Sequence, residues 1–443
     1  MSGNFKIKTW VSKLLITCGL VPASFAATPI KTVPWNGHMG AASFTFDDAM
    51  DDQLENLTPI LEEMPDVRVT FFVSNLGGNR LSKVGAGFAK LAKMGNEIGN
   101  HTNSHLQLPD LDNATLKAEV TDFAEEIEKV MADNGVSVNV TALATPFCAN
   151  NDKVSSVINE HHFINRDGGW HGRNNWDEVP KWLSMQSRVW NHSETAAAEL
   201  LGALDTAAFI GDFAGAEPWE VQVTEPSWLV LLHHGVSDEG GMSIAPADLK
   251  KAFERALKND LWVAPFSTVG AYHRAHFTLD AATATKTDDG YKVTWEMPHP
   301  HMPASIPMKV KLNSEFLKEV DWGKQQDAEA KAAIVIEQNG KSITPDENGV
   351  YTIEFTAKEL TIRLASETPE KPDNPEEPPQ KLHDTHNQPQ LSQQNAQAKF
   401  TLFDINGNRL CTLKSAAVPA SMPKGIYIMR NSISSAVTLV KKQ

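Results

Sequence analysis

Short apolar runs alternate with longer amphipathic stretches along residues 30–278. The apolar runs are hydrophobic at nearly every position, which is typical of strands that helices cover. The stretch 114–135 instead carries apolar residues at helical spacing and stops at Gly135, so it predicts a helix. This alternation predicts an α/β fold, either a barrel or a doubly wound sheet. The expected strands lie at 41–46, 68–73, 97–101, 140–147, 163–166, 228–234 and 261–266.

The hydrophobic pattern changes after residue 278. Residues 279–367 alternate apolar and polar positions, and "QNGK" at 338–341 is typical of a hairpin turn, so a small β-sandwich domain is expected. Residues 368–397 are rich in Pro, acidic residues and Gln, which predicts an extended linker. Residues 398–443 return to short β-like runs with turns at "NGN" and "PKG", which predicts a compact C-terminal β module.

The N-terminus has the features of a secretory signal peptide. Basic residues precede the apolar run "LLITCGLV", which is too short to span a bilayer. The small residues Ser24 and Ala26 indicate cleavage after Ala26, so we expect residues 1–26 to be removed. No later segment is apolar enough to cross a membrane, which predicts an exported protein without membrane insertion. Only Cys148 and Cys411 remain after cleavage, in different domains, so no stabilising disulfide is expected.

The chain of 443 residues carries a formal net charge of −15. An acidic surface argues against nucleic acid and anionic membranes as partners, because both require a basic binding surface. The charge is compatible with a neutral or cationic polymer as substrate, although it does not demand one.

Two pairs of polar residues follow predicted strands of the α/β region. Asp47 and Asp48 end the first strand, and His101 and His105 lie at the end of the third and just beyond it. Each pair alone has an ordinary explanation: a polar strand end with a capping aspartate, or solvated histidines beside a turn. Side chains at the carboxyl ends of such strands are, however, where the chemistry of an α/β protein is expected.

The spacing of the histidines suggests a metal site. His101 and His105 are four residues apart, so a helix or helical turn would point both rings the same way. Two imidazoles and one carboxylate form a hydrolytic Zn²⁺ set that leaves positions for water and substrate. The same donors also suit Co²⁺ or another divalent ion. Asp48, His101 and His105 are therefore the predicted ligands of a divalent metal, with Zn²⁺ favoured.

Several motifs, in this order and spacing, resemble one known family. "TFDD" (45–48), "HTNSH" (101–105), "PF" (146–147) and "LVLLHH" (229–234) are similar to motifs of the polysaccharide deacetylases of the NodB-homology class, carbohydrate esterase family 4. The stretch "LWVAPFSTVGAYHR" (261–274) is similar to the closing strand and helix of that fold. The resemblance covers roughly residues 40–275 and implies a distorted (β/α) barrel for the domain at 30–278.

The resemblance implies roles for the residues around the predicted metal. Asp48, His101 and His105 match the metal ligands of the family, and Asp47 matches its general base. The chemistry agrees with this assignment, because deacetylation needs a water that is activated at neutral pH. It also needs a base that is not itself a metal ligand, which explains two carboxylates with different roles.

The resemblance also implies roles for residues at the ends of two other predicted strands. Phe147 matches the position whose backbone N–H stabilises the oxyanion. A histidine at the end of "WLVLLHH" matches the general acid, which protonates the leaving group. The rings of His233 and His234 face opposite ways if the strand continues. His234 fits the spacing of the family better and is the expected acid, with His233 as the second choice.

One position departs from the family pattern. The third motif of the family has an arginine where this chain has Ala144, and that arginine normally pairs with the base aspartate and orients it. Arg166, at the end of the predicted strand 163–166, is the candidate substitute. Our hypothesis is that its guanidinium reaches Asp47, and the alternative is an ordinary surface arginine.

Four tryptophans lie between residues 170 and 190. Indoles stack on the C–H faces of sugar rings, so a groove lined with them suits a polysaccharide. We expect Trp170 to touch the substrate and Asp167 to line the same groove. Core packing of a long loop is the alternative for this cluster.

The C-terminal module has a resemblance of its own. "DINGN", "PKGIYI" and the final Lys pair are similar to the sorting domains of substrates of the type IX secretion system. This resemblance implies a secreted or cell-surface protein that uses the type IX machinery as a partner. A small carbohydrate-binding or structural β module is the alternative.

Together these features predict a secreted, metal-dependent hydrolase that removes acetyl groups from a polysaccharide. The same water, metal and acid serve an ester, as in acetylated xylan, or an amide, as in chitin-like or peptidoglycan sugars. The exported multidomain organisation favours xylan esters. The alternative is a non-catalytic carbohydrate-binding protein on a decayed deacetylase fold, which only the alanine at position 144 supports.

Overall fold

The computed structural model describes residues 28–168, 172–190, 196–210, 225–320 and 334–364, and strands within 400–442. The expected signal peptide and the expected linker lie outside these residues. Among the helices of the described ranges, none is both long enough and apolar enough to cross a membrane.

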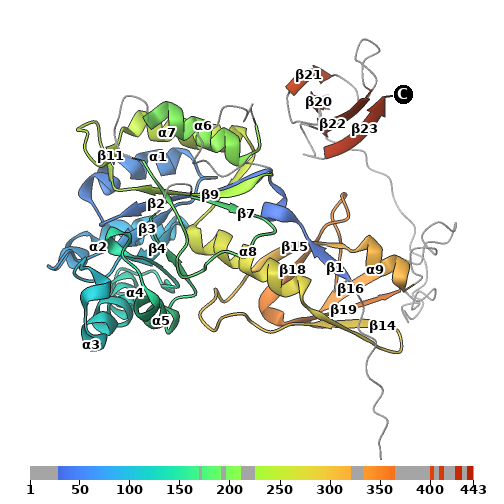
Figure 1. The fold of residues 1–443 in the computed structure, drawn as a ribbon, viewed down its shortest axis with the longest axis horizontal. Helices are drawn as coiled ribbons and strands as arrows, with labels where there is room; N and C mark the ends of the chain where they lie inside the picture. Colours follow the sequence, from blue (N-terminus) through green and yellow to red (C-terminus); the bar gives the residue numbers. More distant parts are fainter. Residues whose placement is uncertain are drawn as a thin grey trace, which may run out of the picture.

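A nine-stranded sheet forms the centre of the α/β domain (Figure 1). Its strand order is β6-β5-β4-β3-β2-β9-β7, and in addition β12 pairs with β2 and β8 pairs with β9. All of these pairs are parallel except that of β7 with β9. The strands are β2 (Gly40–Asp47), β3 (Thr70–Val73), β4 (Glu97–Asn100), β5 (Ala142–Ala144), β6 (Ile164–Arg166), β7 (Arg173–Asn175), β8 (Arg188–Val189), β9 (Ser227–His233) and β12 (Leu261–Val263). The expected strands of this region are therefore all present, in shorter or slightly shifted form.

This sheet curls into a half-barrel and does not close by a continuous ladder. Its two ends are β6 and β7, and β5 and β6 have only three residues each, so they offer few backbone groups for further pairing. The chain crosses the gap as an irregular segment, in which Met185 forms a single bridge to Arg166 before β8 joins β9. The expected distorted barrel is thus an open one.

Helices cover the sheet because their apolar positions recur at helical spacing. In α2 (Arg80–Lys93), Leu81, Val84, Phe88 and Leu91 are buried in the same hydrophobic cluster as the strands. The predicted helix 114–135 forms as three joined pieces, α3 (Asn113–Lys117), a π-helical turn and α4 (Phe123–Asp133). The remaining helices of the domain are α1 (Thr58–Glu63), α5 (Asp152–Asn159), α6 (Ala196–Ala207), α7 (Pro246–Lys258) and α8 (Phe266–Asp280).

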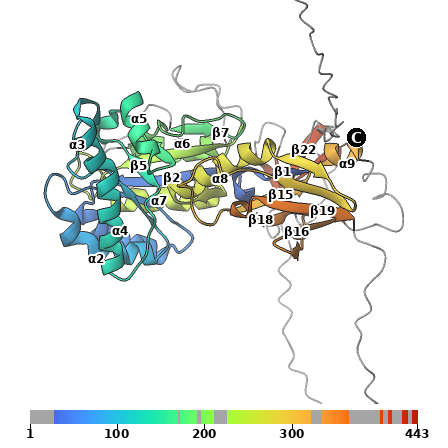
Figure 2. The same ribbon diagram turned by 90° about the horizontal axis from the view of Figure 1, so that it is seen from below.

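Residues 283–320 and 334–364 form a second region, here named the β-domain, which α8 joins to the half-barrel (Figures 1 and 2). Its five-stranded sheet has the order β13-β14-β19-β16-β17, and its three-stranded sheet the order β1-β15-β18. The hairpin expected at "QNGK" is confirmed, because β16 and β17 pair across Asn339 and Gly340, both with positive φ. The elements are β1 (Ile30–Thr32), β13 (Thr283–Lys286), β14 (Gly290–Thr294), β15 (Pro307–Leu312), α9 (Ser314–Glu319), β16 (Ile334–Gln338), β17 (Lys341–Ile343), β18 (Tyr351–Glu354) and β19 (Glu359–Leu364).

The α/β domain and the β-domain share one hydrophobic core. Phe266 and Tyr272 of α8 belong to the same buried cluster as Met308 and Ile353 of the β-domain. The N-terminal strand β1 also pairs with β15, although it precedes the half-barrel in sequence. The two regions are therefore packed together rather than only linked in sequence.

The C-terminal segment contains an antiparallel four-stranded sheet of order β21-β20-β22-β23. Its strands are β20 (Phe400–Phe403), β21 (Arg409–Leu413), β22 (Gly425–Asn431) and β23 (Val437–Lys442). The short strands expected here are present, whereas the sorting function of the segment stays a prediction.

Candidate active site

Two adjacent carboxylates at the end of β2, those of Asp47 and Asp48, both lie 3.6 Å from His101 Nε2. The strand is buried at every position and ends at Asp47. Asp48 and Ala49 then take left-handed conformations, with φ values of 74° and 52°, while the Asp48 N–H donates to the Phe72 carbonyl at 3.1 Å. In a continued strand, neighbouring side chains would point to opposite faces. The left-handed turn brings the Asp48 carboxylate back to the side of Asp47.

The histidine loop after β4 is not a helical turn, so that part of the sequence expectation is wrong. Residues 101–105 are irregular, and Thr102 and His105 have φ values of 64° and 55°. The two rings nevertheless pack edge to face, with centroids 4.9 Å apart. Non-glycine residues with positive φ are uncommon and tend to collect where function requires a fixed geometry.

Asp48, His101 and His105 converge as a potential metal-binding set. One ligand atom from each lies within 4.8 Å of the others. The Asp48 Oδ1 atom is 3.6 Å from His101 Nε2 and 3.5 Å from His105 Nε2. The same oxygen is buried and has no hydrogen-bond partner within the described residues. A buried orphan oxygen facing two imidazole nitrogens is what a divalent cation requires, so these residues fit the predicted metal.

His101 is held in the orientation that a ligand needs. Its Nδ1 lies 2.7 Å from the Ala144 carbonyl, which can only accept, so Nδ1 carries the proton and Nε2 is free. Burial lowers the pKa of the imidazole, although Asp47 and Asp48 raise it, and the net pKa lies below the ordinary value. The ring therefore stays neutral and able to bind a cation.

Arg166 contacts Asp47. Its Nη2 donates to the Asp47 Oδ2 at 2.6 Å, and the guanidinium lies over the Phe72 ring, 5.2 Å from the centroid. Strands β5 and β6 are parallel neighbours, and Ala144 pairs with Arg166 in their register. The arginine thus comes from the position paired with Ala144. An ordinary surface arginine, the alternative, is excluded by an exposed fraction of 1%.

The Asp47 carboxylate is ionised in this environment. Burial raises the pKa of Asp47, but the charge and the hydrogen bond of the Arg166 guanidinium lower it by more, and the net pKa lies below the ordinary value. Its second oxygen, Oδ1, is buried without a hydrogen-bond partner in the described part of the chain. Asp47 therefore presents a charged, unoccupied acceptor atom beside the metal-binding set.

The two histidines at the end of β9 have different environments. His233 is fully buried, and its ring stacks against Phe44 and Phe46 at 6.1 and 5.2 Å. Burial lowers its pKa to about 3, so it stays neutral at physiological pH. His234 lies one residue beyond the strand, is half-buried, and is close enough to Asp47 to influence its pKa. These positions favour His234 over His233 as the candidate acid.

Phe147 lies in a short turn that follows β5. Its φ is 56°, and its ring contacts the His105 ring at a centroid distance of 4.6 Å. The side chain is 59% exposed, so the residue borders the metal-binding set from the solvent side. The oxyanion role of the backbone N–H at this position stays a prediction.

Of the residues expected to line a groove, Trp170 lies outside the described residues. Asp167 is described and buried. Its carboxylate accepts hydrogen bonds from four side chains, those of Thr145, Asn150, Asn165 and Ser184. These contacts fix the segment after β6, and a contact of Asp167 with substrate stays a prediction. Trp176 and Trp190 are buried in the core, whereas Trp182 is only half-buried.

The sequence reasoning missed Gln53. This buried residue follows the turn after β2, and its side-chain amide donates to the Asp47 carbonyl at 2.6 Å and to the His234 carbonyl at 2.8 Å. It thereby ties the backbone of the candidate base to that of the candidate acid. No motif marks Gln53, because its function depends on contacts between residues far apart in sequence.

A second missed residue is Glu119, in the π-helical turn Ala118–Asp122. Its carboxylate accepts from the Ser104 N–H at 2.6 Å, and its carbonyl accepts from the Asn103 N–H at 3.3 Å. The π turn widens the helix here and directs these groups to the histidine loop, as π turns at functional sites often do. The irregular loop that carries His101 and His105 is held in this way.

The fold and the site together define a class of protein. A metal-binding carboxylate–imidazole set beside a second, arginine-paired carboxylate, at the carboxyl ends of parallel strands, is an arrangement suited to metal-dependent hydrolysis. Residues 36–164 match the family model described as Polysaccharide deacetylase. The match supports a polysaccharide deacetylase domain in this part of the chain, and hence a hydrolase of acetyl ester or amide bonds in carbohydrates.

Solved structures of such proteins are similar to the chain at low sequence identity. The Xyl-CE4 domain of a multidomain xylanase from the hindgut metagenome of Trinervitermes trinervoides is 17% identical, with a TM-score of 0.34, covering 52% of this chain and 89% of that one. The chitin deacetylase from Colletotrichum lindemuthianum is 14% identical, with a TM-score of 0.37 and coverages of 54% and 90%. The peptidoglycan deacetylase PdaC from Bacillus subtilis is 14% identical, with a TM-score of 0.32 and coverages of 52% and 90%. No curated protein matches the chain.

Proposed function

We propose that this chain is a secreted, metal-dependent deacetylase of an acetylated polysaccharide, and that Asp47, Asp48, His101, His105 and His234 carry its chemistry. One observation supports the proposal above all others. The three candidate ligands lie within 4.8 Å of one another, and the separate carboxylate of Asp47 is 3.6 Å from His101 Nε2. The three candidate ligands and a separate carboxylate thus lie together, which supports the proposed division of roles.

Asp48, His101 and His105 hold the metal ion. When bound, a divalent ion lowers the pKa of a water and supplies positive charge beside the acetyl carbonyl. Zn²⁺ is the proposed native ion, because two imidazoles and one carboxylate are its usual hydrolytic set, and Co²⁺ can replace it. The free Nε2 atom of His101 and the orphan Oδ1 atom of Asp48 are the donor atoms that support this assignment.

Asp47 is the base. Its ionised carboxylate takes a proton from the attacking water, and Arg166 keeps the carboxylate charged and oriented during this step. Because both side chains are almost fully buried, their contact is little screened by solvent. Gln53 holds the backbone of the base in register with that of the acid.

His234 is the acid, and Phe147 supplies an oxyanion donor. His234 gives a proton to the leaving sugar oxygen or nitrogen, which is then released as an alcohol or amine. The Phe147 N–H donates to the carbonyl oxygen as negative charge develops on it. These two groups come from β9 and from the turn after β5, on either side of the metal-binding set.

The proposed substrate is O-acetylated xylan, with N-acetylglucosaminyl polymers as the second choice. The exported multidomain organisation supports an extracellular polymer, and Trp170 is the residue proposed to stack on it, with Asp167 lining the same groove. The printed names of similar structures include enzymes of xylan, chitin and peptidoglycan, so they do not select among these polymers.

The proposed location is outside the cell or on its surface. Residues 1–26 would direct the chain across the inner membrane, and residues 398–443 would act as the type IX sorting domain. The antiparallel sheet of the C-terminal segment is compatible with this role. Deletion of residues 398–443 should leave acetate release by the purified enzyme unchanged and should block its appearance outside the cell.

The alternative of a decayed, non-catalytic fold rested on the alanine at position 144. Since Arg166 makes the contact with the base from the neighbouring strand, that support is lost.

The proposal is tested by acetate release from O-acetyl xylan, chitin oligomers and peptidoglycan, each with and without a chelator. We expect release from at least one polymer, its loss on chelation and its return with Zn²⁺ or Co²⁺. Asp47→Asn should be inactive while still binding the metal, whereas His105→Ala should bind it more weakly. Binding of polymer without acetate release under any added divalent ion would contradict the proposal.

A further inference from the structure

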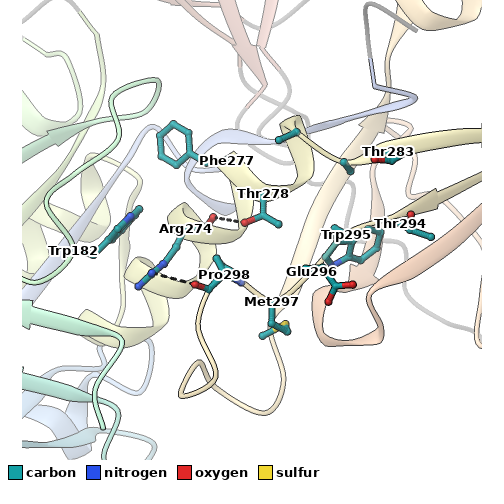
Figure 3. A pocket seen from close by; sticks show the side chains of 12 residues that line it. Trp182, Arg274, Phe277, Thr278, Thr283, Thr294, Trp295, Glu296, Met297 and Pro298 are labelled. Carbon is teal, nitrogen blue, oxygen red and sulfur yellow. Dashed lines mark hydrogen bonds between the residues drawn. The ribbon is translucent and has the colours of Figure 1, made fainter. Parts of the chain in front are cut away.

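Two large cavities lie beyond the metal-binding set. One, of about 730 Å³, is lined on the α/β domain by Cys148, Asp167, Gly168, Ser184 and others. The other, of about 710 Å³, lies where α8 meets the β-domain and is drawn in Figure 3. Both volumes fall within the range of ligand-binding clefts. The lining of neither cavity includes Asp48, His101 or His105.

The two cavities meet at one pair of side chains. Trp182 and Arg274 line both of them. The Arg274 guanidinium lies over the Trp182 ring, 5.5 Å from its centroid, and donates to the carbonyls of Phe163 at 2.6 Å and Pro298 at 3.3 Å. This pair is held by the α/β domain on one side and by the β-domain on the other. The two cavities are therefore adjacent at this pair, and together they are here named the α8 groove.

The groove begins beside the candidate active site. Cys148 directly follows Phe147, and Gly168 follows Arg166 by two residues. The two lining residues also touch, since a Cβ at Gly168 would meet the Cys148 Sγ at 1.9 Å. The first cavity therefore starts next to the turn that carries Phe147.

The far half of the groove has the chemistry of a sugar-binding surface. Trp182, Phe277 and Trp295 supply aromatic faces, although the Trp295 Nε1 is already engaged with the Phe355 carbonyl at 2.8 Å. Glu296 is exposed and Thr278 is half-buried, and both line the same cavity as polar groups (Figure 3). Aromatic faces with a few polar groups recognise the C–H faces and hydroxyls of a neutral sugar.

We propose that the α8 groove binds the segment of the polysaccharide that extends from the acetylated sugar, with the β-domain as one wall. This inference rests on the proposed deacetylase function and adds a role for the β-domain, which carries no chemical motif of its own. The position of the groove next to the candidate site selects the occupant, because a polymer bound there can be covalently joined to the substrate sugar. Longer oligosaccharides should then be better substrates than short ones.

The test compares acetylated xylo-oligosaccharides of two and six sugars as substrates of the full chain. In the unaltered enzyme kcat/KM should be higher for the six-sugar substrate. Trp182→Ala should remove roughly tenfold of this preference, the effect of losing one stacked ring, and should act mainly on the six-sugar value. Glu296→Ala should reduce the preference by a smaller factor. The matched controls are Trp262→Ala and Glu347→Ala, since the first residue is half-buried, the second exposed, and neither lines the groove.

A second readout does not depend on catalysis. Deacetylated six-sugar xylan should slow the reaction of the Cys148 thiol with maleimide, read by peptide mass spectrometry, and Trp182→Ala should abolish this protection. Unchanged chain-length preference and unchanged protection in both groove variants would overturn the inference. Should Trp182→Ala fail to fold, Glu296→Ala decides alone. Absence of acetate release with intact Cys148 protection would instead refute the deacetylase function and leave the groove in place.

Discussion

The ion pair between Arg166 and Asp47 allows a quantitative prediction. Arg166→Met removes the positive charge and keeps a long side chain next to Phe72. The side chains of Arg166 and Asp47 are only 1% and 3% exposed, so the remaining carboxylate cannot be solvated. Breaking a buried pair in this way costs about 3–5 kcal/mol of free energy of unfolding. We expect a loss of that order for Arg166→Met in urea denaturation of the full chain at pH 7 with a chelator present.

The double variant Asp47→Asn/Arg166→Met separates the charge from the packing. With both charges gone no uncompensated ion is buried, so the double variant should be more stable than Arg166→Met alone by at least about 1 kcal/mol. The pH dependence has a definite sign. The pKa of Asp47 is lower in the folded protein than its ordinary value of 3.8. The ionised carboxylate therefore contributes to the free energy of unfolding above pH 3.8, and this contribution is lost as the pH falls below that value. The difference in free energy of unfolding between the unaltered protein and Arg166→Met should therefore become smaller toward acid pH.

The control is Arg255→Met. Arg255 pairs with Asp205 at 2.7 Å, but their side chains are 34% and 28% exposed, so the loss should be clearly smaller. Our reasoning would be refuted by a loss below about 1 kcal/mol for Arg166→Met, or by a double variant no more stable than the single one.

Four further predictions concern other residues. His234→Gln should lower kcat by about 10²–10⁴-fold, the usual contribution of a general acid. His233→Phe, which keeps an aromatic ring in the same cluster, should not lower kcat. Steady-state kinetics on the best substrate compares the two variants, and equal losses of kcat contradict the assignment. Gln53→Leu leaves the Asp47 and His234 carbonyls without their donor, so it should lower the free energy of unfolding by about 1–3 kcal/mol and also lower kcat. Urea denaturation and acetate release measure the two effects, and no change in either refutes the positioning role. Chelation should abolish acetate release and lower the melting temperature, and calorimetric Zn²⁺ titration of His105→Ala should show weaker binding; an unaltered affinity contradicts the ligand set. Burial lowers the pKa of five histidines, to about 3 for His162 and His233 and to about 4 for His273, His276 and His299. The unfolded chain therefore binds protons at a higher pH than the folded chain, and the free energy of unfolding should fall as the pH drops from about 6.5 toward 4. Urea denaturation at a series of pH values measures this, and a flat profile contradicts it.

The predicted strands and most of the candidate site follow from local pattern. The β2 strand was recognisable because every residue in it is buried. Burial on both faces of a strand requires a continuous apolar run. Asp47, Asp48, His101 and His105 stood out because the carboxyl ends of such strands are where the chemistry of an α/β protein is expected. The hairpin at Asn339 and Gly340 was predictable because these two residue types tolerate the positive φ that the turn needs.

Local pattern failed where the geometry depends on distant contacts. The loop at 101–105 was expected to be helical from its spacing, yet its shape is set by Glu119 in a π turn that the helical pattern of 114–135 did not reveal. The open form of the barrel depends on how short strands such as β5 and β6 end, which hydrophobic periodicity does not define. Gln53 has no sequence signature because its two acceptors lie on different strands.

The sequence by itself determined which residues could do the chemistry and on which strands they would lie, because apolar runs and polar strand ends are local properties of the chain. Only the tertiary structure decided that an arginine from β6 reaches Asp47 from the position paired with Ala144, that Gln53 joins the backbones of Asp47 and His234, and that Trp182 and Arg274 line two neighbouring cavities. Each of these depends on the register and packing of segments far apart in sequence, and such contacts leave no periodic signal in the chain.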